Sequence, residues 1–248
     1  GLFDDPFVDE KQAVQLVASS EHTGLAREVA RQSIVLLKNK DKLLPLKKDI
    51  RTLAVIGPNA DNVYNMLGDY TAPQADGTVV TVLDGIRQKV SKETRVLYAK
   101  GCAVRDSSRT GFKDAIETAR NADAVVMVMG GSSARDFSSE YEETGAAKVT
   151  INQISDMESG EGYDRATLHL MGRQLELLEE ISRLGKPVVL IKGRPLLMEG
   201  AIQEAEAIVD AWYPGMQGGN AVADVLFGDY NPAGRLTLSV PRSVGQLP

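Results

Sequence analysis

The stretch DAVVMVMGG at residues 123–131 decides the fold class, because it is a nearly continuous apolar run that ends in two glycines. A second run of the same kind, KPVVLIKG, occupies residues 186–193. Strands of this composition are usually buried on both faces, as in parallel sheets that helices cover. A strand with one solvent-exposed face instead alternates apolar and polar residues. The two runs therefore predict a parallel sheet with helices on both sides.

Helical and strand patterns alternate along the rest of the chain. Helices are expected over 24–39, 80–91, 111–122, 171–185 and 218–229, a further element over 206–215, and further strands over 52–58, 95–102 and 234–241. The last of these strands alternates polar and apolar residues, which is typical of an edge strand. We predict an α/β fold: a three-layer sandwich with a mostly parallel sheet of about six strands and an antiparallel edge strand.

Two parts of unequal size are expected. Residues 1–49 are predicted to be a linker and incoming helix, and residues 50–248 an α/β sandwich domain with a long acidic loop at 131–170. The chain opens with GLFDDPFVDEKQ, which has no initiator Met and is typical of the middle of a longer polypeptide. We therefore expect another domain to precede it.

Composition excludes several partners. The 28 basic and 34 acidic residues give a net charge of −6, which argues against nucleic acid, since phosphate binding usually leaves a concentrated basic patch. No apolar stretch approaches the roughly 18 residues of a membrane span, so no membrane is expected as a partner. A single cysteine, Cys102, rules out an internal disulfide and leaves the compartment open. A periplasmic or secreted location of the full-length protein is one option.

The acidic loop is long for a connection in a compact domain, because about forty residues separate the strand at 123–131 from the next helix. It contains eight acidic residues: Asp136, Glu140, Glu142, Glu143, Asp156, Glu158, Glu161 and Asp164. It also follows the carboxyl end of a parallel strand, where open α/β sheets place their ligand sites. Glycines on both sides of Glu161 favour a defined turn at that residue, and a mobile acidic loop is the alternative.

Several kinds of chemistry lack their motifs. The chain has no G-x-G-x-x-G, no G-x-x-x-x-G-K-[ST] and no G-x-S-x-G, and its two histidines and one cysteine lie far apart. The loop also lacks the ligand spacing of an EF-hand. Glycoside hydrolysis needs two carboxylates, about 5–5.5 Å apart in retaining enzymes, and Glu161 with Glu158 and Asp156 nearby fits the proton donor. Spacing alone does not favour this chemistry over a binding loop.

Motifs along nearly the whole chain, however, form one pattern. They are GLFDDPFVD, LAREVARQSIVLLKNKDKLLPL, LAVIGPNAD, LGDY, SGEGYDRATLHLMGRQLELLEEI, KPVVLIKGRPL and AIVDAWYPGMQGGNAVADVLFGDYNPAGRLTLSVP. Together they resemble the C-terminal α/β sandwich domain of glycoside hydrolase family 3, which includes β-glucosidases and β-xylosidases. The last motif is long enough to be specific.

The resemblance implies a retaining β-glycosidase that acts on terminal β-linked glucose or xylose and needs no cofactor or metal. An N-terminal barrel of the same polypeptide would carry an Asp nucleophile, and this chain would supply the acid/base. The matching residue is Glu161, with Glu158 as runner-up, and Asp164 and Arg165 are expected to brace the loop. Since no segment resembles the barrel, we expect the isolated chain to be inactive. The alternative is a stand-alone carbohydrate- or nucleotide-binding α/β module.

Overall fold

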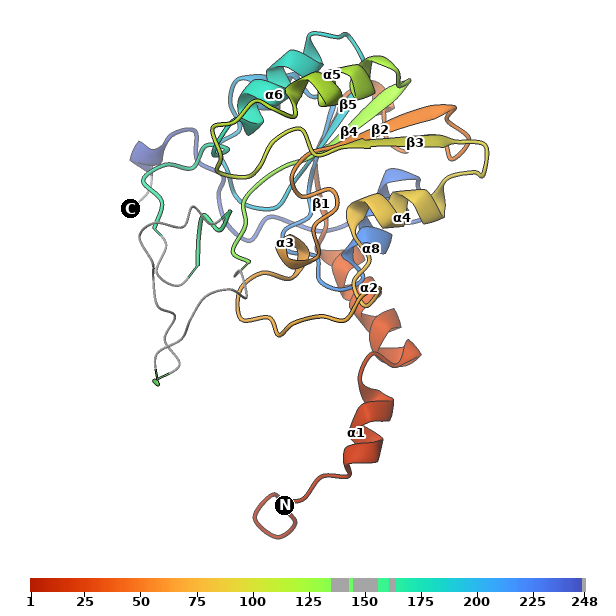
Figure 1. Cartoon of the computed structure of the whole chain (residues 1–248), viewed down its shortest axis with the longest axis vertical. Helices are drawn as coiled ribbons and strands as arrows, with labels where there is room; N and C mark the ends of the chain where they lie inside the picture. Colours follow the sequence, from red (N-terminus) through yellow and green to blue (C-terminus); the bar gives the residue numbers. More distant parts are fainter. Residues whose placement is uncertain (135–142, 145–155, 161–163, 247–248) are drawn as a thin grey trace.

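The computed structural model of the chain describes residues 1–134, 143–144, 156–160 and 164–246. Its centre is a six-stranded sheet in the order β1-β6-β5-β4-β2-β3 (Figure 1). The strands are β1 Val35–Asn39, β2 Thr52–Ile56, β3 Arg95–Ala99, β4 Ala124–Val128, β5 Val188–Lys192 and β6 Ala207–Asp210. All neighbours are parallel except β1 and β6, which are antiparallel. The predicted mixed, mostly parallel sheet is therefore confirmed.

Helices cover both faces of this sheet and make the three layers that the sequence predicts. The helices are α1 Glu10–Leu16, α2 Ser20–Ser33, α3 Val63–Leu67, α4 Val82–Lys89, α5 Phe112–Arg120, α6 Gln174–Ser182, α7 Ala201–Glu204 and α8 Gly218–Leu226, with short 3₁₀ turns at Lys40–Lys42 and Val244–Gln246. One core packs α2, α4 and α8 against the sheet, and a second core packs α5, α6 and α7 against its other face (Figure 1).

The apolar runs are buried because each strand faces both cores. Along β4, Val126 and Val128 belong to the core with α4 and α8, while Val125 and Met127 belong to the core with α5 and α6. All five residues of β4 are buried. A strand that faces two cores needs an apolar residue at every position, which explains the continuous runs from which the fold class was predicted.

Two predicted elements differ from the structure. The helix expected over 24–39 ends at Ser33, and Val35–Asn39 form β1, the antiparallel edge strand. Residues 34–35 are Ile and Val, which fit a strand better than a helix, and the free edge of β6 gives them a partner. The strand expected over 234–241 is wrong, because this stretch forms no strand; the edge it would extend is occupied by β1, and Gly234 N donates a single hydrogen bond to Ile34 O.

A buried carboxylate fastens α2 to the sandwich. Asp224 of α8 is fully buried and accepts hydrogen bonds from Arg27 Nη2 at 2.6 Å and Arg31 Nε at 2.7 Å. Lys89, the last residue of α4, donates to the same carboxylate and to Asp229. Hydrogen bonds from the three cations hold the pKa of Asp224 well below its usual range, although burial alone would raise it.

The residues before α2, including α1, extend away from the sandwich as an arm (Figure 1). The arm and the outer side of α2 expose many large apolar side chains: Leu2, Phe3, Phe7, Val8, Val14, Leu16, Val17, Leu25 and Val29. Single exposed apolar residues are ordinary, whereas a series of this length marks a surface that packs against something else. Among the described residues, no helix combines the length and apolar character that crossing a membrane requires.

Candidate active site

The carboxyl ends of β2 and β4 form the point where the strand order reverses. From β2 the chain moves to one side to make β3 and to the other side to make β4, β5 and β6. Ligands of open α/β sheets bind outside such a switch point. Here the two strand ends lie very close, since Gly57 has φ +129° and an added Cβ would lie 2.2 Å from Val128 O. Only glycine fits this position.

A short network of hydrogen-bonded side chains lies next to the switch point, at the carboxyl ends of the strands. Asn59, just after β2, donates from Nδ2 to Gly131 O at 3.1 Å, and Asn65 Nδ2 donates to Asn59 Oδ1 at 2.7 Å. Ser132 Oγ then donates to Asn65 Oδ1 at 2.6 Å. Because these side chains bond to one another, they fix the start of the acidic loop relative to β2.

Glu158 lies beside this network as the anion of a buried ion triad with Arg165 and Arg194. Its carboxylate accepts from Arg165 Nη1 through Oε2 and lies 3.4 Å from Arg194 Nη1 through Oε1. The side chain of Glu158 is 0% exposed, compared with 7% for Arg165 and 26% for Arg194. Burial lowers the pKa of Arg165, and the attraction of Glu158 opposes this shift.

The backbone around Glu158 is tethered to β4 and to the loop after β3. Glu158 N donates to Ser132 O at 2.8 Å, and Arg105 Nη1 donates to Met157 O at 2.8 Å. Asp156 Oδ1 accepts from the backbone N–H groups of Val104 and Arg105 at 3.0 and 3.2 Å. Residues 156–158 are thus held on the body of the domain.

The predicted site residues have different outcomes. Glu161 lies outside the described residues, so its role stays a prediction. Glu158, the runner-up, is described, and both of its carboxylate oxygens face guanidinium groups inside the domain instead of solvent. Arg165 makes its ion pair with Glu158, whereas Asp164 is exposed. The expected role of Asp164 and Arg165 in bracing the loop stays a prediction.

Two members of the site, Ser132 and Arg194, are absent from the candidates predicted from the sequence. For Ser132, only its place a few residues after β4 could have indicated its role. Arg194 follows β5 in KGRP and reaches Ser159 Oγ as well as Glu158. Its position after a parallel strand, at the same edge as the loop, was the available signal.

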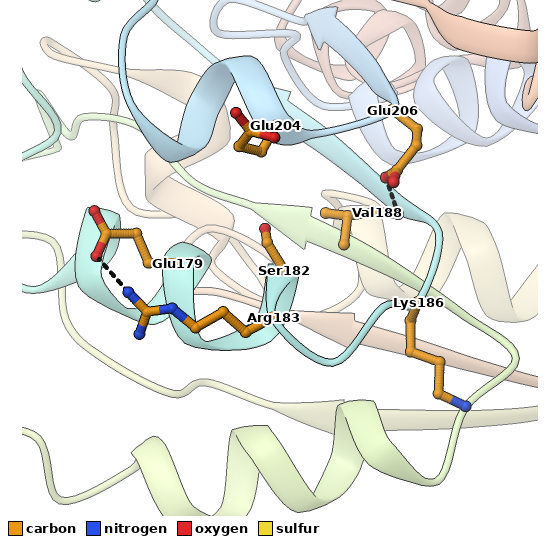
Figure 2. A pocket seen from close by; sticks show the side chains of 7 residues that line it. All are labelled: Glu179, Ser182, Arg183, Lys186, Val188, Glu204 and Glu206. Carbon is orange, nitrogen blue, oxygen red and sulfur yellow. Dashed lines mark hydrogen bonds and ion pairs between the residues drawn. The ribbon is translucent and has the colours of Figure 1, made fainter.

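A pocket lies elsewhere, at the amino end of β5. It measures about 340 Å³ and is lined by Glu179, Ser182, Arg183, Lys186, Val188, Glu204 and Glu206. Figure 2 shows that its polar groups partly pair with one another: Glu206 accepts from Val188 N, and Arg183 contacts Glu179. None of the predicted site residues lines it. In the part of the chain that the structure describes, no three His, Cys, Asp or Glu side chains are grouped to hold a metal ion.

The sequence and the fold of the chain are also similar to those of known proteins. The family described as Glycosyl hydrolase family 3 C-terminal domain matches residues 34–248. The chain belongs to glycosyl hydrolase family 3. The matched range begins one residue before β1, inside the segment that was predicted to be a linker.

Individual family 3 proteins are similar over the whole chain. A β-xylosidase of Formosa agariphila is 42% identical over 258 residues, and a periplasmic β-glucosidase of Salmonella typhimurium is 38% identical over 275 residues. A solved β-glucosidase from Erythrobacter marinus has a TM-score of 0.82 at 36% identity and covers 100% of this chain and 34% of that one. The alignments include 100% of this chain but only 32% and 33% of the two curated relatives. The chain therefore spans about a third of their length.

Proposed function

We propose that this chain is the part of a retaining β-glycosidase that supplies the general acid/base, Glu161, for removing terminal β-linked glucose or xylose. One observation carries the proposal: residues 156–158, in the acidic loop of a family 3 domain, are tethered at the carboxyl edge of the sheet, beside the switch point. Open α/β sheets use this edge for ligands.

The neighbouring acids support the choice of Glu161 within the stretch 155–165. Asp156 is occupied by two backbone N–H groups, and Glu158 by two guanidinium groups. Neither carboxylate is presented to a glycosidic oxygen, which a general acid must reach within hydrogen-bonding distance. Asp164 precedes the ion-paired Arg165 and has no glycine beside it. Glu161, between two glycines, is the remaining candidate of the motif.

The chemistry divides into two steps in which the same carboxyl group changes role. First, Glu161 donates its proton to the glycosidic oxygen as the bond to the anomeric carbon breaks, while the nucleophilic carboxylate bonds to that carbon. Second, Glu161 takes a proton from water, whose oxygen displaces the carboxylate from the anomeric carbon. The sugar leaves with its configuration retained, and Glu161 regains its proton.

The second carboxylate would come from a barrel domain of the same polypeptide. The chain spans about a third of its relatives, which leaves room for such a domain, and the arm together with the outer side of α2 exposes the apolar surface that would contact it. A β-glucosidase of Listeria innocua has been solved with glucose, and a mutant of it with laminaribiose. We extend this substrate class, β-linked glucosides, to the longer protein and expect the isolated chain to lack activity.

The test compares two lengths of polypeptide on p-nitrophenyl β-glucoside and β-xyloside. The natural full-length protein should hydrolyse at least one substrate, and the 248-residue chain neither. In the full-length protein, Glu161→Gln should slow substrates with poor leaving groups by about 10²–10⁴-fold and activated ones far less, since only the former depend on protonation. Equal slowing of both classes, or turnover by the isolated chain, would contradict the proposal.

A further inference from the structure

We infer that the buried ion triad of Arg165, Glu158 and Arg194 is a positioning device for Glu161, an inference that rests on the proposed function. Glu158 and Arg165 are seven positions apart in the chain. Their ion pair therefore closes a short loop, and Glu161 lies within it. Whatever holds the two ends of so short a loop restricts the residues between them.

The triad ties this loop to the central strands on both sides. Glu158 N is bonded to Ser132 O after β4, and Arg194, which follows β5, reaches both Glu158 and Ser159 Oγ. The closing residue Arg165 also donates from Nε to Thr167 O at 3.0 Å. The Glu158 end of the loop is thus fixed to the strand ends by a backbone hydrogen bond and by Arg194, and the Arg165 end is fixed through its ion pair with Glu158.

Stability alone does not account for such an arrangement. A fully buried carboxylate with two guanidinium groups loses much hydration, and apolar residues of similar volume often give equal or greater stability. What an ion triad adds is direction, because a guanidinium binds a carboxylate in a fixed geometry. General acid catalysis depends on such geometry, since a misplacement of about 1 Å can reduce a rate by roughly 10²-fold.

The space around Glu158 is equally restrictive. An added Cβ on Gly131 would lie 1.8 Å from Glu158 Oε1 and 2.9 Å from Arg194 Cδ. Gly131 itself does not need a positive φ. An alanine at this position would therefore displace the carboxylate of Glu158 while every charge of the triad remains.

The experiment compares Glu158→Gln with Asp224→Asn in the natural full-length polypeptide. Both changes convert a carboxylate with a 0% exposed side chain and guanidinium partners into an amide, and Asp224 lies in the α2–α4–α8 layer. The readout is kcat/KM on phenyl β-glycoside divided by kcat/KM on its 2,4-dinitrophenyl analogue. A purely structural loss lowers both rates together and leaves this ratio unchanged.

We expect Glu158→Gln to lower the ratio by about tenfold or more, toward the roughly 10²–10⁴-fold of Glu161→Gln, while Asp224→Asn leaves it at the wild-type value. Sodium azide should also accelerate turnover of the activated substrate by Glu158→Gln. Azide forms a bond to the anomeric carbon as the bond to the nucleophile breaks, and it needs no general base. If Glu158→Gln fails to fold, Gly131→Ala and Arg165→Lys provide the same readout.

Two results overturn the inference, and they are distinguishable. If Glu161→Gln lowers the ratio and Glu158→Gln behaves like Asp224→Asn, Glu161 is the acid/base but the triad does not position it. If Glu161→Gln leaves the ratio unchanged, the proposed function fails and the positioning role fails with it.

Discussion

Replacing Asp224 by Asn removes the one anion that three cations share. The side chain of Asp224 is 0% exposed, and it binds Arg27, Arg31 and Lys89. Asparagine has nearly the same shape but no charge, and its amide group would place N–H donors opposite guanidinium donors. The cations are only partly exposed, at 32%, 26% and 16% respectively, so water compensates them incompletely.

Breaking a buried ion pair from one side costs about 3–5 kcal/mol. Asparagine keeps one acceptor oxygen, so we expect about 3 kcal/mol, which for a domain of this size lowers Tm by roughly 6–12 °C. Urea unfolding followed by far-UV circular dichroism measures the change. Glu117→Gln is the control, because Glu117 is 62% exposed and pairs with Arg120 on the surface of α5. A urea midpoint for Asp224→Asn equal to that of the control would refute the reasoning.

Three further outcomes are expected. Since the three cations hold the folded pKa of Asp224 below its unfolded value of about 3.9, its stabilisation is present above about pH 4 and is lost as pH falls; Asp224→Asn should therefore flatten the acid limb of a stability–pH curve. Gln174→Leu should destabilise by about 3 kcal/mol or more in urea, because Gln174 is 0% exposed and its amide group satisfies Gly130 N, Gly130 O and Val104 O. Burial raises the pKa of the Cys102 thiol to about 12, so a thiol reagent at pH 8 should label Cys102 in urea but not in the native protein; rapid native labelling would contradict this.

The central strands were predictable because their sequences carry the signal of burial on both faces. β4 and β5 needed no tertiary information, since every position in them is apolar up to Lys192. The edge strand was not predictable in this way. Residues 34–39 follow α2 without a break, so the strand preference of Ile34 and Val35 was too short a signal to separate them from the helix. Pairing with the free edge of β6, far away in sequence, completes β1.

From the sequence, the candidate site could be assigned to one edge of the sheet but not to particular carboxylates. The length and acidity of the loop, and its place after β4, pointed to the edge where Glu158, Arg165 and Arg194 lie. The partner of Arg165 could not be chosen, because Glu158 and Asp164 are both close to it in the chain. Geometry decides between them: the backbone bond from Glu158 to Ser132 turns that carboxylate inward, where Arg194 also arrives.

The antiparallel pairing of β1 with β6 has a consequence for synthesis on the ribosome. β1 is made early, but the strand that receives it, Ala207–Asp210, is made near the end of the chain. The ion pair between Arg27 and Asp224 likewise joins an early residue to a late one, 197 positions apart. Neither contact can form before its later residues are synthesised, and contacts of such separation slow folding. The segment that leads into this domain therefore cannot dock until β6 and α8 have been made, which gives any domain before it time to fold first.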